Sequence, residues 1–263
     1  MENLKMETTI KEKAKTFIDA VNAADPSTVK SLVAEDYIQH NPFVPTGRAL
    51  FLGLFSVLKE HGTKANTQRI IQDGNYVVMH NLWAGAAPFG ADKMVAFDVL
   101  RMDEAGIIAE HWDAMMGYTS PNPSGRSLID GETAIRNPDD TATNKQQVIK
   151  LFDVLINGTQ EEVGQAVAEN FHSDYIQHNP AAADGIAGFV AAMPHEQWVF
   201  QKQHKVLGEG NFVLSISEGT HKAHHSVFYD LLRLEEGKIA EHWDVIQQIP
   251  TENLANENTM FGF

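Results

Sequence analysis

The chain contains no cysteine, no long apolar run and few basic residues. Without cysteine there is no disulfide, no thiolate nucleophile and no cysteine-ligated metal. The longest apolar stretch, residues 49–58, is far too short to cross a bilayer. Only 20 lysines and arginines accompany 35 acidic residues, which gives a net charge of −15. This balance argues against nucleic acid and against an acidic membrane surface as partners.

The start of the chain and its length narrow the class of protein further. Residues 1–15 mix glutamate and lysine and lack the apolar segment of a secretory signal, so we expect a cytoplasmic protein. A length of 263 residues accommodates two domains of ordinary size, each able to bury a core of its own.

The most informative feature that is present is an internal repeat. Tyr-Ile-Gln-His-Asn-Pro occupies residues 37–42 and recurs at 175–180, and Glu-His-Trp-Asp occupies 110–113 and recurs at 241–244. Between these blocks, Phe-Asp-Val-Leu-Arg at 97–101 corresponds to Tyr-Asp-Leu-Leu-Arg at 229–233. Matching blocks in the same order predict a duplicated domain. Because the repeated letters are mostly polar, they indicate a shared site as well as a shared core.

Each repeat predicts helices followed by an antiparallel meander, which is an α+β domain. In the first repeat we expect helices over residues 10–22, 27–34 and 46–61, and strands over 37–40, 66–72, 76–84, 94–102 and 107–115. In the second we expect helices over 144–156, 160–169 and 185–193, and strands over 201–207, 212–219, 226–234 and 238–247. The resulting domains are 1–118 and 143–249, with a linker at 119–142 and a tail at 250–263.

Two connecting segments carry apolar residues that are candidates for docking on a domain. The linker is rich in proline and glycine, yet it contains Ser-Leu-Ile at residues 127–129. The tail is polar until Met260 and Phe261, which could cover an apolar edge.

The three repeated blocks together resemble the SnoaL-like polyketide cyclase family of the nuclear transport factor 2-like superfamily. The block at residues 237–244, Gly-Lys-Ile-Ala-Glu-His-Trp-Asp, is most similar to a subgroup of predicted aldol-condensation enzymes. The resemblance implies two tandem cone-shaped α+β barrels, each with a pocket between a curved sheet and its helices. It also implies acid–base chemistry on a carbonyl-containing substrate without a cofactor. In related cyclases an aspartate on the last strand is the acid or base, and Asp113 and Asp244 match that position.

Hairpin geometry gives an independent prediction of the site. A three-residue loop at 235–237 places Asp230 opposite His242, and a four-residue loop at 103–106 places Asp98 opposite His111. A two-residue loop at 236–237 is the alternative, and it would place Asp230 opposite Trp243. Side chains alternate along a strand, so each hairpin collects a histidine and two aspartates on one face. The predicted catalytic residues are Asp98, His111 and Asp113 in the first repeat and Asp230, His242 and Asp244 in the second.

Such a face has a chemical use. A carboxylate beside an imidazole fixes its tautomer, and a second buried carboxylate can exchange a proton near neutral pH. The alternative is a buried polar network that only stabilises the sheet. The predicted substrate-binding residues are Tyr37, Gln39, His40, Asn41 and His80 in the first repeat and Tyr175, Gln177, His178 and Asn179 in the second.

Three other functions remain open. A non-catalytic small-molecule binder would use the same pocket. A metal-dependent enzyme would combine His40 and His111 with Asp98 or Asp113, although we expect no metal and no cofactor. Epoxide hydrolysis would need an arginine between two carboxylates in the pocket. Arg101 and Arg233 stand an odd number of residues from Asp98 and Asp230 and should therefore pair with Glu110 and Glu241 on the opposite face.

The two repeats should pack as an intramolecular pseudo-dimer, sheet against sheet, which leaves a further homo-oligomer open. Trp112, Trp243, Phe97 and Tyr229 are the residues expected at that contact. The repeats are unequal, because His80 aligns with Ile216 and the loop at residues 85–93 has no full counterpart.

Overall fold

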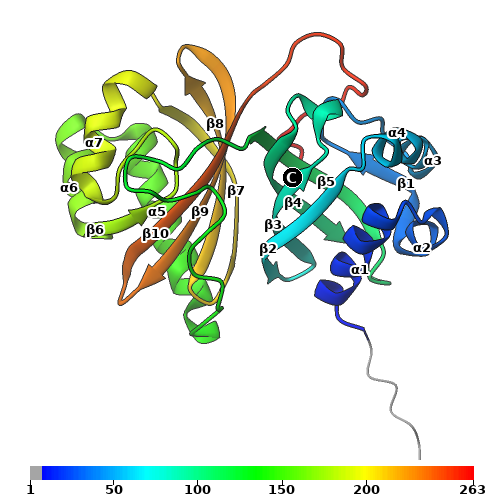
Figure 1. Cartoon of the computed structure of the whole chain (residues 1–263). Coiled ribbons are helices and arrows are strands. Elements are labelled where there is room, and N and C mark those ends of the chain that lie inside the picture. The colour runs from blue at the N-terminus through cyan, green and yellow to red at the C-terminus, as the bar shows by residue number, and fades with distance from the viewer. Residues whose placement is uncertain (1–7) are drawn as a thin grey trace, which may run out of the picture.

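The computed structural model describes residues 8–263, so residues 1–7 of the first expected domain lie outside the described residues. Two α+β domains lie side by side, with their sheets facing each other and most helices on the outside (Figure 1). The first domain contains α1 (Ile10–Ala23), α2 (Pro26–Leu32), β1 (Val33–Gln39), α3 (Arg48–Gly53), α4 (Phe55–Glu60), β2 (Lys64–Asp73), β3 (Tyr76–Ala84), η1 (Ala87–Phe89), β4 (Lys93–Met102) and β5 (Ile108–Gly117). The second contains η2 (Pro138–Asp140), α5 (Thr141–Asn157), α6 (Gln160–Asn170), β6 (Phe171–Gln177), α7 (Gly185–Glu196), β7 (Val199–Glu209), β8 (Phe212–His221), β9 (His224–Glu235) and β10 (Lys238–Gln248).

The two sheets have the same topology. Their strand orders are β1-β5-β4-β3-β2 and β6-β10-β9-β8-β7. Strands β2 to β5 form the expected antiparallel meander, and β1 adds to it in parallel with β5. Each sheet is open, and its concave face is covered by helices instead of by further strands.

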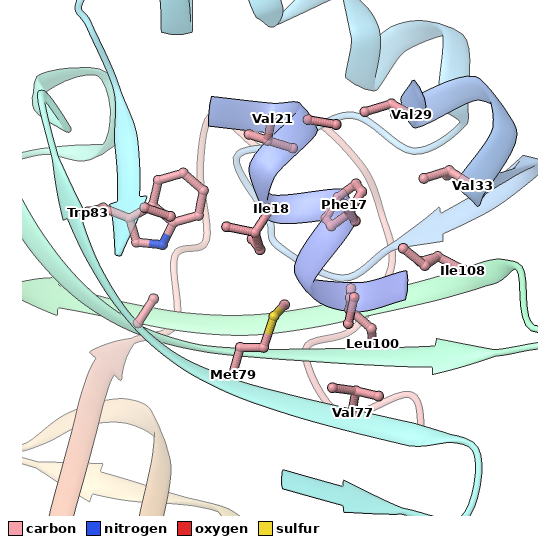
Figure 2. Packing of buried hydrophobic residues seen from close by; sticks show 14 of the residues in the cluster. Phe17, Ile18, Val21, Val29, Val33, Val77, Met79, Trp83, Leu100 and Ile108 are labelled. Carbon is pink, nitrogen blue, oxygen red and sulfur yellow. The ribbon is translucent and has the colours of Figure 1, made fainter. Parts of the chain in front are cut away.

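Helix α1 begins at a capping box and covers the concave face of the first sheet. The Thr9 side chain accepts a hydrogen bond from the Glu12 amide, and the Glu12 side chain accepts from the Thr9 amide. Phe17, Ile18 and Val21 follow at helical spacing and are buried against the curved strands (Figure 2). Burying side chains of this size stabilises the fold by roughly 1.5–3 kcal/mol each.

The other faces of the two sheets pack against each other. One apolar cluster takes residues from both domains, including Phe97 and Trp112 from the first and Tyr229 and Trp243 from the second. All four side chains are at most 1% exposed, as predicted for the contact between the repeats. Hydrogen bonds join the domains around this cluster, for example from the Met115 amide to Oε1 of Gln247, 2.7 Å apart.

Two extended segments each follow one domain in the sequence and pack on the other domain. We call residues 119–132, which follow β5, the first arm, and residues 250–263, which follow β10, the second arm. The second arm leaves the second domain and ends on the first, where Phe263 stacks on Trp112 with ring centroids 4.5 Å apart (Figure 1). The first arm lies on the second domain, where the Asp130 carbonyl accepts a hydrogen bond from the indole of Trp243. Both apolar candidates dock, since Leu128 and Met260 are buried in the cluster shared by the sheets.

No helix within residues 8–263 is long and apolar enough to cross a membrane.

Candidate functional site

The pairing of the strands differs from the prediction, and a bulge explains why the predicted face still forms. The second hairpin turns through the two residues Glu236 and Gly237, both with positive φ. Ala240 is then an extra residue in β10, which advances the register by one and sets Asp230 opposite Asp244. The expectation that Asp230 lies opposite His242 is therefore wrong.

The first hairpin reaches the same pairing through its own bulge at Ala109. Asp98 lies opposite Asp113, not opposite His111 as predicted. His111 is two residues from Asp113 and so shares its face, from which it reaches Asp98 diagonally. Nε2 of His111 donates to Oδ1 of Asp98 at 3.0 Å, and the predicted trio of side chains is together.

The Gln-His-Asn block enters the first site because β1 runs parallel to β5, with Gln39 beside His111. The Gln39 side-chain nitrogen donates to Nδ1 of His111 and to the Tyr37 hydroxyl, each at 3.0 Å. Asn41 donates from its amide nitrogen Nδ2 to Oδ2 of Asp113 at 2.9 Å. Tyr37, Gln39 and Asn41 thus lie in the network in which the sequence placed them.

One oxygen of this network has no partner. Oδ1 of Asp113 is buried without a hydrogen bond among the described residues. Asp113 lines a cavity of about 50 Å³ between the helices and the sheet, together with apolar side chains from both. The apolar residues of the lining are Phe17, Ile18, Val21, Val44, Phe51, Leu54, Leu58, Trp83, Phe89 and Met115. The cavity therefore presents one unpaired carboxylate oxygen in mainly apolar surroundings, beside the hydrogen-bonded residues of the network.

Burial sets the protonation of the site. It raises the pKa of Asp113 to about 6, against the opposing effect of His111. Burial lowers the pKa of His111, but the hydrogen bond to Asp98 and the charges of Asp113 and Asp98 outweigh it, so that the pKa lies above 6.5. Burial, with the nearby Asp113 and Asp98, also raises the pKa of Tyr37 well above 10. The tyrosine hydroxyl thus stays protonated at neutral pH, while Asp113 can gain or lose a proton.

The second domain repeats these contacts. Nε2 of His242 donates to Oδ1 of Asp230 at 3.0 Å, and Asn179 donates to Oδ2 of Asp244 at 2.7 Å. Gln177 donates to the Tyr175 hydroxyl at 3.0 Å. Burial raises the pKa of Asp244 to about 6, and Oδ1 of Asp244 is again buried without a partner in the part of the chain that the structure describes.

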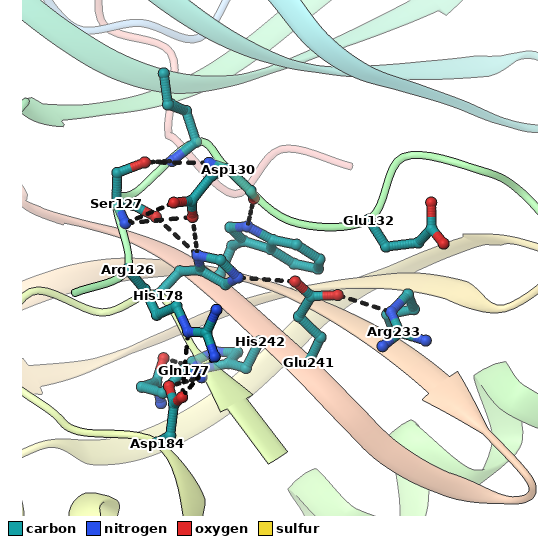
Figure 3. Close-up of polar contacts among 12 residues, drawn as sticks. Arg126, Ser127, Asp130, Glu132, Gln177, His178, Asp184, Arg233, Glu241 and His242 are labelled. Carbon is teal, nitrogen blue, oxygen red and sulfur yellow. Dashed lines mark hydrogen bonds and ion pairs between the residues drawn. The ribbon is translucent and has the colours of Figure 1, made fainter. Parts of the chain in front are cut away.

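Two predicted substrate-binding residues, His40 and His178, do not enter the pockets. Side chains alternate, so the residue after Gln39 or Gln177 points to the opposite face, toward the other domain. Nε2 of His40 lies 2.8 Å from Oε1 of Glu110, and its ring stacks on Trp112. His178 makes the equivalent contacts with Glu241 and Trp243, and Ser127 and Asp130 of the first arm cover it (Figure 3).

His80 also faces the other domain, contrary to the prediction. It pairs with Phe97 on β4 and stacks on it, whereas the neighbouring Asn81 shares the face of Asp98. Nδ2 of Asn81 donates to Oδ2 of Asp98 at 2.7 Å. The same alternation that predicted the trio would have found Asn81, had it been extended from β4 to β3.

Arg101 and Arg233 lie outside the pockets, as predicted. Nε of Arg101 is 2.7 Å from Glu110, and Nε of Arg233 is 2.8 Å from Glu241 (Figure 3). The carboxylate–arginine–carboxylate arrangement that epoxide opening needs is absent from the cavity lining of the first domain.

A cation would fit the residues of the first domain poorly. Asp98, His111 and Asp113 offer ligand atoms within 4.8 Å of one another, as do Asp230, His242 and Asp244. In the first domain, however, both ring nitrogens of His111 and both oxygens of Asp98 are already hydrogen-bonded. His40 and His111 lie on opposite faces of the sheet and cannot bind one ion together. The arrangement suits proton transfer better than metal binding.

Comparison with known families decides which fold family the first repeat represents. Residues 14–111 match the model of the SnoaL-like domain. The first repeat therefore contains a SnoaL-like domain. The second repeat has the strand order and site contacts of the first, which fits a tandem arrangement of two related domains. No curated protein sequence matches the chain.

Several solved structures are similar to part of this chain. IdmH of Streptomyces antibioticus, a candidate polyketide cyclase, is 22% identical over 41% of this chain and 91% of its own, with a TM-score of 0.35. An NTF2-like protein of unknown function from Cytophaga hutchinsonii is 16% identical over 43% and 95%, with a TM-score of 0.37. TsrD of Streptomyces laurentii is 18% identical over 43% and 91%, with a TM-score of 0.36.

Proposed function

We propose that the first domain is an acid–base enzyme that removes a proton from the carbon next to a carbonyl group of a small, partly apolar substrate. Proton removal of this kind underlies cyclisation, aldol condensation, isomerisation and dehydration. It needs a base, a donor for the carbonyl oxygen and an enclosure that excludes water. The cavity at Asp113 offers candidates for all three.

The observation that carries the proposal is a pair of unpartnered buried atoms in one cavity lining. Within residues 8–263, Oδ1 of Asp113 is an acceptor without a donor, and Nε1 of Trp83 is a donor without an acceptor. Buried polar atoms are rarely left unpaired, and leaving one so costs roughly 1–3 kcal/mol. A bound carbonyl compound would pair both, with its oxygen at the indole and its acidic carbon at the carboxylate.

The proposed step balances within the substrate and Asp113. The carboxylate takes the proton, the electron pair of the broken C–H bond forms a C=C bond, and the negative charge moves to the carbonyl oxygen. Trp83 donates a hydrogen bond to that oxygen. Asn41 holds Asp113 by a hydrogen bond, and this bond and the charge of His111 keep Asp113 partly ionised near neutral pH. Proton transfer by a positioned carboxylate contributes typically about 10²–10⁴-fold to a rate.

A non-catalytic binding protein is the second candidate, because the same two unpaired atoms would also hold a ligand that never reacts. Exchange of carbon-bound hydrogen separates the two. Wild-type protein in D₂O should exchange the hydrogens beside the carbonyl of the methyl ketone benzylacetone, as followed by proton NMR. Asp113→Asn should lose this exchange, and Trp83→Phe, which keeps the ring and removes the donor, should slow it.

The Arg101→Ala variant is the matched control, because Arg101 lies on the opposite face and should retain exchange in the folded protein. Binding of benzylacetone without any exchange above buffer would favour the binding protein. Full exchange in Asp113→Asn would exclude Asp113 as the base.

A further inference from the structure

A surface groove adjoins the cavity of the first domain. The groove has a volume of about 550 Å³, and it shares Asn41, Phe89 and Met115 with the lining of the inner cavity. Asn41 donates a hydrogen bond to Asp113 and also lines the groove, so only this one side chain separates the groove from the carboxylate.

The inner cavity and the groove differ so much in size that they would accommodate different parts of a substrate, a small head and a larger tail. The inner cavity of about 50 Å³ accommodates only a few atoms, since a single buried water already needs roughly 10–15 Å³ on this measure. A ketone head fills it. The rest of a larger molecule would have to lie in the groove, which has about ten times the volume.

The lining of the groove defines the chemistry of that tail. No charged residue lines it, although the chain carries a net charge of −15. Met94, Met115 and Met116 line it together with Phe43, a residue that is 53% exposed. Methionine and aromatic side chains adapt to flat, apolar ligands through dispersion and sulfur–aromatic contacts. The groove therefore matches an uncharged apolar or aromatic group.

The second domain completes the groove. Ile246, Gln247 and Gln248 of β10 form one side of it, and Oε1 of Gln247 holds the Met115 amide at 2.7 Å. The space of about 30 Å³ beside Asp244 shares only Ile246 with the groove. The inner cavity of the first domain shares three lining residues with it, so we assign the groove to the first site.

We propose that this groove between the domains binds the uncharged, apolar or aromatic tail of the substrate while the carbonyl head reaches Asp113. The second domain then determines which substrates the first domain accepts. The position of the head rests on the proposed function, whereas the binding of the tail rests on the groove alone.

Paired ketones test the groove. Acetone supplies the head, and benzylacetone supplies the same head with an arylalkyl tail. Titration of the wild-type protein, followed by NMR chemical shifts, should give binding of benzylacetone at least about tenfold tighter than that of acetone, as expected for burying an aromatic ring. Gln248→Trp should fill the groove from the second domain and weaken benzylacetone about tenfold, leaving acetone unchanged.

Gln248→Ala is the matched control. Gln248 is exposed, so neither substitution should disturb folding, and the alanine variant should bind benzylacetone at least as well as wild type. Equal binding of the two ketones, or equal effects of tryptophan and alanine, would overturn the groove proposal. Preferred binding of benzylacetone without hydrogen exchange would retain the groove and reject the proposed chemistry. Hydrogen exchange without tighter binding of benzylacetone would retain the proposed chemistry and reject the groove.

Discussion

The two domains share the aspartate–histidine–aspartate trio but hold it differently. In the first, Asn81 binds the second oxygen of Asp98. In the second, Ser217 occupies the equivalent position on β8, and Oδ2 of Asp230 is buried without a partner among the described residues. A carboxylate held at both oxygens keeps its imidazole in one orientation, which is what a proton-transfer site needs. The comparison indicates that the first domain is the better organised of the two.

The surroundings of the two cavities differ in the same direction. The extra loop of the first domain becomes η1, and its Phe89 lines both the inner cavity and the groove. In the second domain, Trp198 and Phe189 stack with ring centroids 5.5 Å apart beside the cavity of Asp244. The cavity of the first domain thus adjoins a surface groove, whereas two aromatic rings fill part of the corresponding space in the second domain. The extra loop at residues 85–93 therefore corresponds to a difference in how a ligand could reach the two cavities.

Substitution of Asp113 and of Asp244 should give the largest difference between the domains, measured as the rate of ketone hydrogen exchange. Asp113→Asn should lower the rate of ketone exchange by about 10²–10⁴-fold, because it removes the proposed base. Asp244→Asn should change the rate by less than about tenfold. NMR exchange rates measure both. Equal losses would mean that the second site contributes as much as the first.

The buried ion pairs should also separate the domains. Glu241 has a side chain only 1% exposed and depends on Arg233, whereas the Glu110 side chain is 12% exposed. Removing one partner of a buried pair costs about 3–5 kcal/mol, against about 1 kcal/mol or less at an exposed site. Arg233→Ala should therefore destabilise the protein more than Arg101→Ala does. Urea unfolding of both variants provides the measurement, and the opposite order would contradict this account of burial.

The pH dependence of stability should be alike in the two domains. The pKa values of Asp113 and Asp244 are raised from 3.8 to about 6 in the folded protein. The folded state thus holds protons that the unfolded state has released, and stability falls as the pH rises from about 4 to above 6. Replacing either aspartate by asparagine should remove part of this loss of stability with pH. Each variant should raise the free energy of unfolding at pH 7 by up to about 3 kcal/mol.

Thermal melts between pH 4 and pH 8 test this sign. Higher stability of Asp113→Asn at pH 7, combined with loss of exchange, is the behaviour of a residue kept for chemistry. Lower stability would identify Asp113 as a structural member of the network instead.

The smallest expected effect concerns the contact between the sheets. The Tyr229 hydroxyl is buried without a hydrogen bond to any residue from 8 to 263, and the equivalent residue of the first domain is Phe97. Tyr229→Phe removes an unsatisfied polar group and should stabilise the protein by about 1 kcal/mol. Destabilisation would show that the hydroxyl has a partner, such as a water molecule. Calorimetric unfolding of the variant beside wild type decides between the two.

The sequence predicted the architecture well because the repeat, the helical periodicity and the turn residues agreed with one another. It predicted the Asp98–His111–Asp113 face but not its pairing. A single bulge residue such as Ala109 leaves no mark in the pattern of polar and apolar letters. The error at His40 has another origin: Gln39, His40 and Asn41 were taken together as a motif, although alternation sends the middle residue to the opposite face. Trp83 was missed because an unpaired donor becomes visible only when the packing around it is known.

The exchanged arms make the two halves of the chain interdependent. The first arm belongs by covalent connection to one half and by contact to the other, where it covers Trp243, and the second arm does the same for Trp112. A backbone break near residue 135 would therefore leave two fragments, each missing the cover of its own indole and carrying that of its neighbour. The half-chains are then complementary ligands, and reassembly of the split protein is the natural consequence.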